Sequence, residues 1–204
     1  MARIVVRRAL LSCLILLVST FAASSSEAQR PRTHVLLDSD ANNELDDQHA
    51  IAYMLFNGDA FDVRGITVNR TRGGGDVEQH AKEAERIVKL ASLERRFTVT
   101  RGANGSFDEI VRHVGEPTFD GSAAVELIIR RAHEPSGQPL VLLPVGKLTN
   151  IALALKKDPS IASKVRIVWL GSNYPEPGEY NQENDEAALS YILDVNVPFV
   201  FASN

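Results

Sequence analysis

The sequence has a single cysteine, Cys13, which lies inside an apolar run near the N-terminus. If that run is removed after export, the mature chain has no disulfide and no thiol chemistry. A protein sent to an oxidising compartment without disulfides depends on its core, or on a bound metal, to hold its fold.

Other common markers of function are also missing. The chain has only five histidines, and no two of them have the spacing of a metal-binding pair, so we expect each to be structural or exposed. Negative charge exceeds positive charge, with a formal net charge of −4, which argues against a nucleic-acid backbone as partner. The glycines at 73–75 lack the strand–GxxxxGK[ST]–helix context of a phosphate-binding loop, and we interpret them as a flexible loop.

Residues 1–28 have the layout of a secretory signal peptide. Arg3, Arg7 and Arg8 precede the apolar run, and small residues stand at the −3 and −1 positions before Gln29. An uncleaved membrane anchor is the alternative, although the run is short for a membrane span. We therefore predict a secreted or periplasmic protein, with a linker at 29–33 and one domain at 34–204.

The order of apolar segments predicts the fold class. The 204 residues are 44% hydrophobic, which is enough for one domain with a buried core. We expect strands at 34–39, 61–68, 97–101, 139–145, 165–171 and 198–202, and helices at 45–56, 76–91, 122–133, 148–156 and 185–194. Strands that alternate with helices indicate an α/β domain, with a mostly parallel, Rossmann-like open sheet and helices on both faces. Ligands of such sheets bind beyond the carboxyl ends of the strands.

The stretch "VLLDSDANNELDD" places five carboxylates at the end of the first expected strand. A helix N-terminus favours nearby negative charge, but only by roughly 0.3–1 kcal/mol, which does not account for the whole group. Hard oxygen ligands in a tight loop suit Ca²⁺ or Mg²⁺. We therefore favour a divalent metal site over a solvated, helix-capping turn.

The same stretch resembles the signature of the nucleoside hydrolase family, in its inosine–uridine-preferring type. That signature is a strand followed by Asp-x-Asp, a short loop, Asp-Asp and a helix. The resemblance continues through "GITVN" (65–69), "RGANGS" (101–106), the segment beginning "VGKLTNIALAL" (145–173) and "GEYNQENDEAA" (178–188).

The resemblance implies Ca²⁺-dependent hydrolysis of the N-glycosidic bond of ribonucleosides, giving ribose and free base. Asp40 would be the general base for a Ca²⁺-bound water that attacks the sugar C1′. Asp40 and Asp47 would bind Ca²⁺ by carboxylate and Thr149 by its main-chain carbonyl, while Asp38 would support the carboxylates from behind. The residues that would hold the ribose hydroxyls are Asp46, Asn69, Asn173, Glu179 and Asn181.

Some features depart from the family pattern. Its usual Gly-Asn after the second strand is replaced by "NRTRGGG" (69–75), and Asn42 replaces the usual glycine of the acidic loop. The family also has a further metal-binding aspartate, and often a histidine near the leaving base, in a C-terminal portion that we expect this chain to lack. Members often form homo-oligomers.

Three alternatives stay open. The first is a non-catalytic protein that binds nucleosides or carbohydrates with a metal. The second is a truncated product whose site is never completed. The third is a phosphatase of the haloacid dehalogenase type, which also begins with Asp-x-Asp but would have to use Lys156, Lys157 and Asp158 at a helix end.

Overall fold

The computed structural model describes residues 31–173 and 176–203. The proposed signal peptide at 1–28, with Cys13, lies outside these residues. Among the residues that are described, no helix has both the length and the apolar character needed to cross a membrane.

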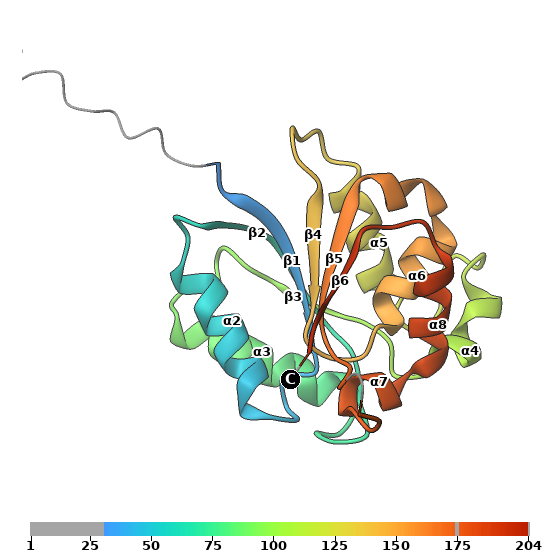
Figure 1. The fold of residues 1–204 in the computed structure, drawn as a ribbon. Coiled ribbons are helices and arrows are strands. Elements are labelled where there is room, and N and C mark those ends of the chain that lie inside the picture. Colours follow the sequence, from blue (N-terminus) through green and yellow to red (C-terminus); the bar gives the residue numbers. More distant parts are fainter. Residues whose placement is uncertain (1–30, 174–175, 204) are drawn as a thin grey trace, which may run out of the picture. The chain divides into compact units, whose positions relative to one another are not determined.

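The described residues form a six-stranded sheet in the order β3-β2-β1-β4-β5-β6, and every neighbouring pair is parallel (Figure 1). The strands are β1 Thr33–Ser39, β2 Phe61–Val68, β3 Val99–Arg101, β4 Leu140–Pro144, β5 Val165–Leu170 and β6 Phe199–Ala202. This confirms the predicted α/β class with a parallel, Rossmann-like sheet.

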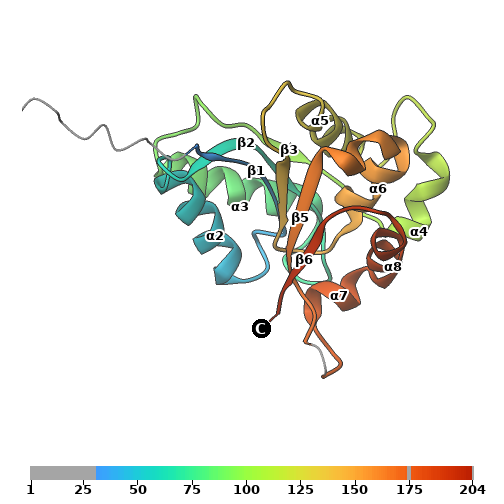
Figure 2. The ribbon, with the colours of Figure 1, turned by 45° about the horizontal axis from the view of Figure 1, so that its top comes forward.

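Helices cover both faces of the sheet (Figure 2). One face carries α2 (Leu45–Phe56) and α3 (Val77–Leu90), and the other carries α4 (Phe107–Ile110), α5 (Ser122–Ala132), α6 (Thr149–Lys157) and α8 (Glu186–Asp194). The core is accordingly divided into two hydrophobic clusters. Successive β1 residues alternate between them, with Val35 and Leu37 in the α2–α3 cluster and Leu36 in the other, as the period of a strand requires.

The expected elements match the observed ones closely. β2 and α2 have the predicted bounds, and the other predicted elements differ by one or two residues at their ends. The prediction missed four short helices: α4, α7 (Tyr180–Asn184) and the 3₁₀ segments η1 (Val111–His113) and η2 (Pro159–Ser163). These segments are too short to show an apolar period.

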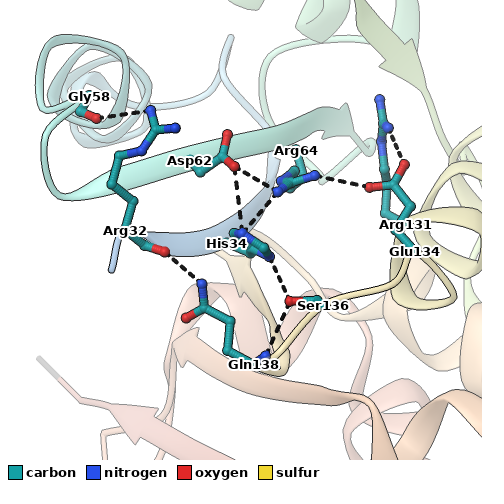
Figure 3. A network of polar contacts seen from close by, with 9 residues as sticks. All are labelled: Arg32, His34, Gly58, Asp62, Arg64, Arg131, Glu134, Ser136 and Gln138. Atoms are coloured by element: carbon teal, nitrogen blue, oxygen red, sulfur yellow. Dashed lines mark hydrogen bonds and ion pairs between the residues drawn. The ribbon is translucent and has the colours of Figure 1, made fainter. Parts of the chain in front are cut away.

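A polar network holds the N-terminal end of the sheet (Figure 3). The β1–β2 register shifts between Val35 and Leu36, so Arg64 stands opposite no β1 residue. Its guanidinium pairs with Asp62 at 2.7 Å and with Glu134 at 3.3 Å. The network therefore ties the start of the β2 strand to the connection between α5 and β4.

The strand order reverses direction between β1 and β4. From β1 the chain proceeds outward to β2 and β3, and then returns to β4 on the opposite side of β1. In open parallel sheets a crevice opens at such a point, beyond the carboxyl ends of the two strands. The acidic stretch directly follows β1, so the fold places it in this crevice.

Candidate active site

Asp38 is the last carboxylate within β1 and is fully buried. Its side chain accepts hydrogen bonds from Thr67 Oγ1 at 2.6 Å, Asn69 Nδ2 at 2.8 Å and Asn150 Nδ2 at 2.8 Å. Burial raises its pKa to about 6, although the three hydrogen bonds act in the opposite direction. With its oxygens so engaged, Asp38 can hold neighbouring elements together but is poorly placed to bind a ligand itself.

Asp40 follows β1 and is 1% exposed. Its Oδ2 accepts a hydrogen bond of 2.5 Å from Thr71 Oγ1. Its Oδ1 is buried and has no hydrogen-bond partner among the described residues. Burial is the main cause that raises the pKa of this carboxyl to about 6, and the charges of Asp46 and Glu44 add to it.

Gly146, just after β4, lies against the free oxygen of Asp40. A Cβ atom at this position would stand 2.5 Å from Asp40 Oδ1, which is closer than atoms can approach. Only glycine therefore allows the carboxylate to occupy this place. The close approach joins the loop after β1 to the loop after β4.

Asp47 lies in the first turn of α2 and is also buried. Ser39 Oγ donates a hydrogen bond of 2.6 Å to its Oδ1. Burial, followed by the charge of Asp40, raises the pKa of Asp47 to about 8. The two carboxylates thus lie close enough to oppose each other's ionisation.

Asp47 lines a cavity of about 160 Å³, whereas Asp40 is not among the lining residues. The loops that follow β1, β4 and β5 form its walls, with the residues Asn43, Glu44, Asp46, Asp47, Val145, Leu170, Asn173, Gly178, Glu179, Tyr180 and Asn181. Its volume is below the roughly 300–1,000 Å³ of complete small-molecule sites. A larger cavity, of about 430 Å³, lies at the opposite end of the sheet, around His34 and Lys164.

Glu179 and Asn181 form the wall after β5. Glu179 is the N-cap of α7, and its carboxylate accepts hydrogen bonds from the backbone N–H groups of Ser172, Asn181 and Gln182 at 2.8–3.0 Å. Asn181 Nδ2 donates to the main-chain carbonyls of Val145 at 2.9 Å and Leu170 at 3.0 Å. These bonds fix both side chains at the edge of the cavity.

The structure brings together most of the residues that the sequence suggested. Those that line the cavity are Asp46, Asp47, Asn173, Glu179 and Asn181. Asn69 does not line it; it is buried and donates to Asp38 and, at 3.3 Å, to the carbonyl of Lys147.

Thr149 is also placed apart from the cavity. It is buried in the first turn of α6, and its hydroxyl donates a hydrogen bond to Asp185. Val145, by contrast, lines the cavity, and its main-chain carbonyl accepts the hydrogen bond from Asn181. No local pattern in the sequence could distinguish these two positions.

Sequence reasoning also missed the role of the segment 70–75, of which we interpreted the glycines at 73–75 as a flexible loop. The structure instead ties it at several points. Arg72 N donates to Asn184 Oδ1 at 2.7 Å, Gly73 N to Tyr180 Oη at 2.7 Å, and Asn42 Nδ2 to the Gly74 carbonyl at 2.6 Å. The only feature of the sequence that hinted at this role was Thr71, a hydroxyl-bearing residue within "NRTRGGG" (69–75).

The donors of this site fit a hard divalent cation. Asp40 and Asp47 are buried carboxylates that oppose each other's charge, and Asp40 keeps one buried oxygen without a partner. A cation would relieve both conditions, and oxygen-only ligands suit Ca²⁺ or Mg²⁺. Within 31–173 and 176–203, however, no three side chains of His, Cys, Asp or Glu converge as a metal-binding group. The described residues thus offer two carboxylates, those of Asp40 and Asp47.

Comparison with known proteins identifies the family of the chain. Residues 35–202 match the family model described as inosine-uridine preferring nucleoside hydrolase. The pyrimidine-specific ribonucleoside hydrolase RihA of Escherichia coli (strain K12) is 28% identical over 189 residues, which cover 82% of this chain and 59% of that protein. The chain thus spans about three fifths of the length of the curated relatives it matches.

Solved structures show the same fold. The purine-preferring ribonucleoside hydrolase from Gardnerella vaginalis is 26% identical with a TM-score of 0.65, over 84% of this chain and 60% of that one. A plant nucleoside hydrolase, 23% identical, has a TM-score of 0.69 over 85% of this chain and 60% of that one, and it supports the fold alone. Since the family model covers nearly all of the described residues, the chain belongs to the inosine-uridine preferring nucleoside hydrolase family.

Proposed function

We propose that this protein hydrolyses the N-glycosidic bond of ribonucleosides to ribose and free base, with Ca²⁺ as cofactor. One observation carries the proposal: two buried carboxylates interact at the strand-order reversal, of which Asp40 has an oxygen without a partner and Asp47 lines a polar cavity. Membership of the family supports the reaction class. The two relatives named above are described as pyrimidine-specific and purine-preferring, so the proposal covers ribonucleosides without choosing a base.

Asp40 is the general base of the proposed reaction. Water forms a bond to C1′ of the ribose and gives its proton to the Asp40 carboxylate, while the C1′–N bond breaks and its electron pair passes to the nucleobase. The nucleobase takes up a proton from solvent and leaves as the free base. The sugar gains positive charge as the C1′–N bond breaks. The carboxylates around the cavity, Asp47 and Glu179 among them, stabilise that charge, as carboxylates do in glycosidases.

The other polar groups of the cavity hold the ribose. Asp46 and Glu179 can accept hydrogen bonds from ribose hydroxyls, and Asn173 can accept or donate. Asn181 can accept with its Oδ1, since its Nδ2 already donates to the carbonyls of Val145 and Leu170. The volume of about 160 Å³ suits one sugar better than a whole nucleoside, which leaves the base outside the described walls.

The carboxylates of Asp40 and Asp47 would hold the calcium ion. We place the main-chain carbonyl of Val145 beside them in preference to that of Thr149, because Val145 lines the cavity and Thr149 does not. When bound, the cation would lower the pKa of water at the site, so that a carboxylate can act as base near neutral pH.

The phosphatase alternative finds no support at its proposed lysine. Lys157 Nζ donates to the carbonyl of Val114 at 2.8 Å and lies 3.4 Å from Glu126 Oε1. Lys157 is the last residue of α6, whereas the acidic loop faces the first turn of that helix through the bond between Asp38 and Asn150. Lys157 therefore lies at the opposite end of α6 from the acidic loop.

We further propose that residues 1–28 direct export to the periplasm or the medium and are then removed. The N-terminal sequence of the exported protein would begin at Gln29. If the protein stays in the cytoplasm, or keeps residues 1–28, this assignment is wrong.

The activity test is release of reducing sugar from a panel of purine and pyrimidine ribonucleosides, with Ca²⁺ or with EDTA. We expect release with Ca²⁺ only, and its loss in Asp40→Asn. Asp59→Asn, at an exposed turn, is the matched control. Calorimetry run beside the assay identifies the main alternative: nucleoside and Ca²⁺ bound without any turnover would indicate a binding protein and contradict the proposed hydrolase.

A further inference from the structure

The segment 70–75, between β2 and α3, bridges two walls of the site. On one side, the side-chain amide of Asn42, in the acidic loop, donates to the Gly74 carbonyl. The backbone N–H of Asn42 donates to Nδ1 of His80, on α3, at 3.2 Å. On the other side the segment bonds to Tyr180 and Asn184 of α7, and the Arg72 guanidinium lies 5.2 Å from the centre of the Tyr180 ring. The segment is therefore held in place from both directions.

Thr71 is the member of this segment that reaches the catalytic carboxylate. Its side chain is buried, at 3% exposure, and its hydroxyl donates the 2.5 Å bond to Asp40 Oδ2. A carboxylate can rotate, and a donor fixed on one oxygen determines where the other oxygen lies. Here the other oxygen, Oδ1, lies against Gly146 and has no partner among the described residues.

The second carboxylate is held in the same manner. Ser39 Oγ donates to Asp47 Oδ1 at 2.6 Å, from within β1. Each of the two acids is thus bound by one hydroxyl, but the hydroxyls come from different elements. Ser39 is fixed by the sheet, whereas Thr71 is fixed by the contacts of a glycine-rich segment.

We infer that Thr71 is a positioning residue, which turns the Asp40 carboxylate so that Oδ1 faces the metal and the attacking water. The inference rests on the proposed function in taking Asp40 as base and metal ligand. A simpler role is that Thr71 only satisfies a buried carboxylate. The two roles differ in outcome, because a purely structural threonine would affect stability without affecting the affinity of the site for its cation.

The test compares the wild type with Thr71→Val, Thr71→Ser and Thr100→Val. Valine keeps the size of threonine and removes the hydroxyl, and serine restores the hydroxyl. Thr100, on β3, lines a separate cavity with Arg96 and Arg130 and serves as the control for loss of a threonine hydroxyl in this sheet. Circular dichroism and thermal unfolding establish that each variant is folded, and calorimetry measures the Kd for Ca²⁺. Crystal structures of wild type and Thr71→Val without added metal show the orientation of Asp40.

We expect Thr71→Val to weaken Ca²⁺ binding by about 10- to 100-fold, the usual effect of removing a group that orients a metal ligand. Thr71→Ser and Thr100→Val should stay within about threefold of wild type, and the Asp40 carboxylate should be rotated in Thr71→Val. A folded Thr71→Val that binds Ca²⁺ like wild type would overturn the inference and leave the proposed function standing. If wild type itself binds no Ca²⁺, the proposed cofactor fails. The crystal structures then decide separately: an unchanged Asp40 in Thr71→Val overturns the positioning role, and a rotated one supports it.

Discussion

Asn150, in the first turn of α6, donates a hydrogen bond of 2.8 Å to Asp38, which lies 112 positions earlier at the end of β1. The same amide group donates to the Val68 carbonyl at 3.1 Å and accepts from the backbone N–H of Ala103 at 2.9 Å. One side chain therefore joins the ends of β1 and β2, the loop after β3 and the start of α6. The candidate active site is built directly on this buried junction.

Asn150→Ala should destabilise the fold without touching the cavity. The change leaves the buried N–H of Ala103 unsatisfied, which costs about 1–3 kcal/mol, and removes one of the two hydrogen bonds to Asp38 Oδ1, which keeps that from Thr67. We expect the free energy of unfolding in urea to fall by roughly 2–4 kcal/mol. Asn57→Ala is the control, because the side chain of Asn57 makes an exposed hydrogen bond to the Tyr53 carbonyl at the end of α2. Equal losses in the two variants would contradict the importance of the junction.

The metal-free protein should become less stable as the pH rises from 5 to 8. The pKa values of Asp38 and Asp40 are raised to about 6 and that of Asp47 to about 8, against an ordinary value of 3.8. The folded state therefore keeps protons that the unfolded chain has already lost, so the stabilisation is complete below pH 3.8 and is lost as the pH passes through 6 and 8. Thermal unfolding in EDTA measures the fall, and Ca²⁺ should reduce it. A melting temperature that is flat or rising over this range would show that these carboxyls ionise normally.

Gly146→Ala should weaken cation binding. The added methyl would stand 2.5 Å from Asp40 Oδ1, so the carboxylate has to leave its place. We expect the Kd for Ca²⁺ to rise by at least about tenfold, as for other disturbances around metal ligands, together with a moderate loss of stability. Gly137→Ala, where nothing lies within 4 Å of the added carbon, tests the cost of the substitution itself. Unchanged Ca²⁺ binding in Gly146→Ala would mean that the free oxygen of Asp40 is not a ligand.

Local patterns were enough to predict the elements that carry a strong hydrophobic period. β2 and α2 have the expected bounds, and the acidic stretch runs from the end of β1 to the first turn of α2, as expected. The short α7 helix was missed because "YNQEN" has no apolar period. Its start is fixed by the Glu179 side chain and by contacts from distant loops, such as that of Gly73 with Tyr180.

In the candidate site, too, some residues could be predicted from local sequence and others only from the folded structure. The carboxylates could be found from sequence because they are crowded within ten residues. The groups that orient them could not, since Thr71 lies 31 positions from Asp40 and only folding brings the two together. That Val145 lines the cavity and Thr149 does not likewise depends on the course of the chain after β4, which no spacing in the sequence reveals.

Asp47→Asn should distinguish two effects of the Asp47 carboxylate: its repulsion with Asp40 in the metal-free protein and its binding of Ca²⁺. At pH 8 without metal, the variant removes a buried negative charge that Asp40 opposes, while Ser39 can still donate to the amide oxygen. We therefore expect the metal-free variant to melt higher than wild type, by roughly 2–4 °C for each kcal/mol of repulsion that is relieved. Saturating Ca²⁺ should raise the melting temperature of wild type, because a ligand at 100 times its Kd adds about 2.7 kcal/mol, but should leave the variant unchanged. The exposed substitution Asp59→Asn should behave as wild type in both conditions. If Asp47→Asn retains the full Ca²⁺ shift, Asp47 is not a metal ligand; if the metal-free variant melts lower, its carboxylate is already stabilised by groups other than a cation.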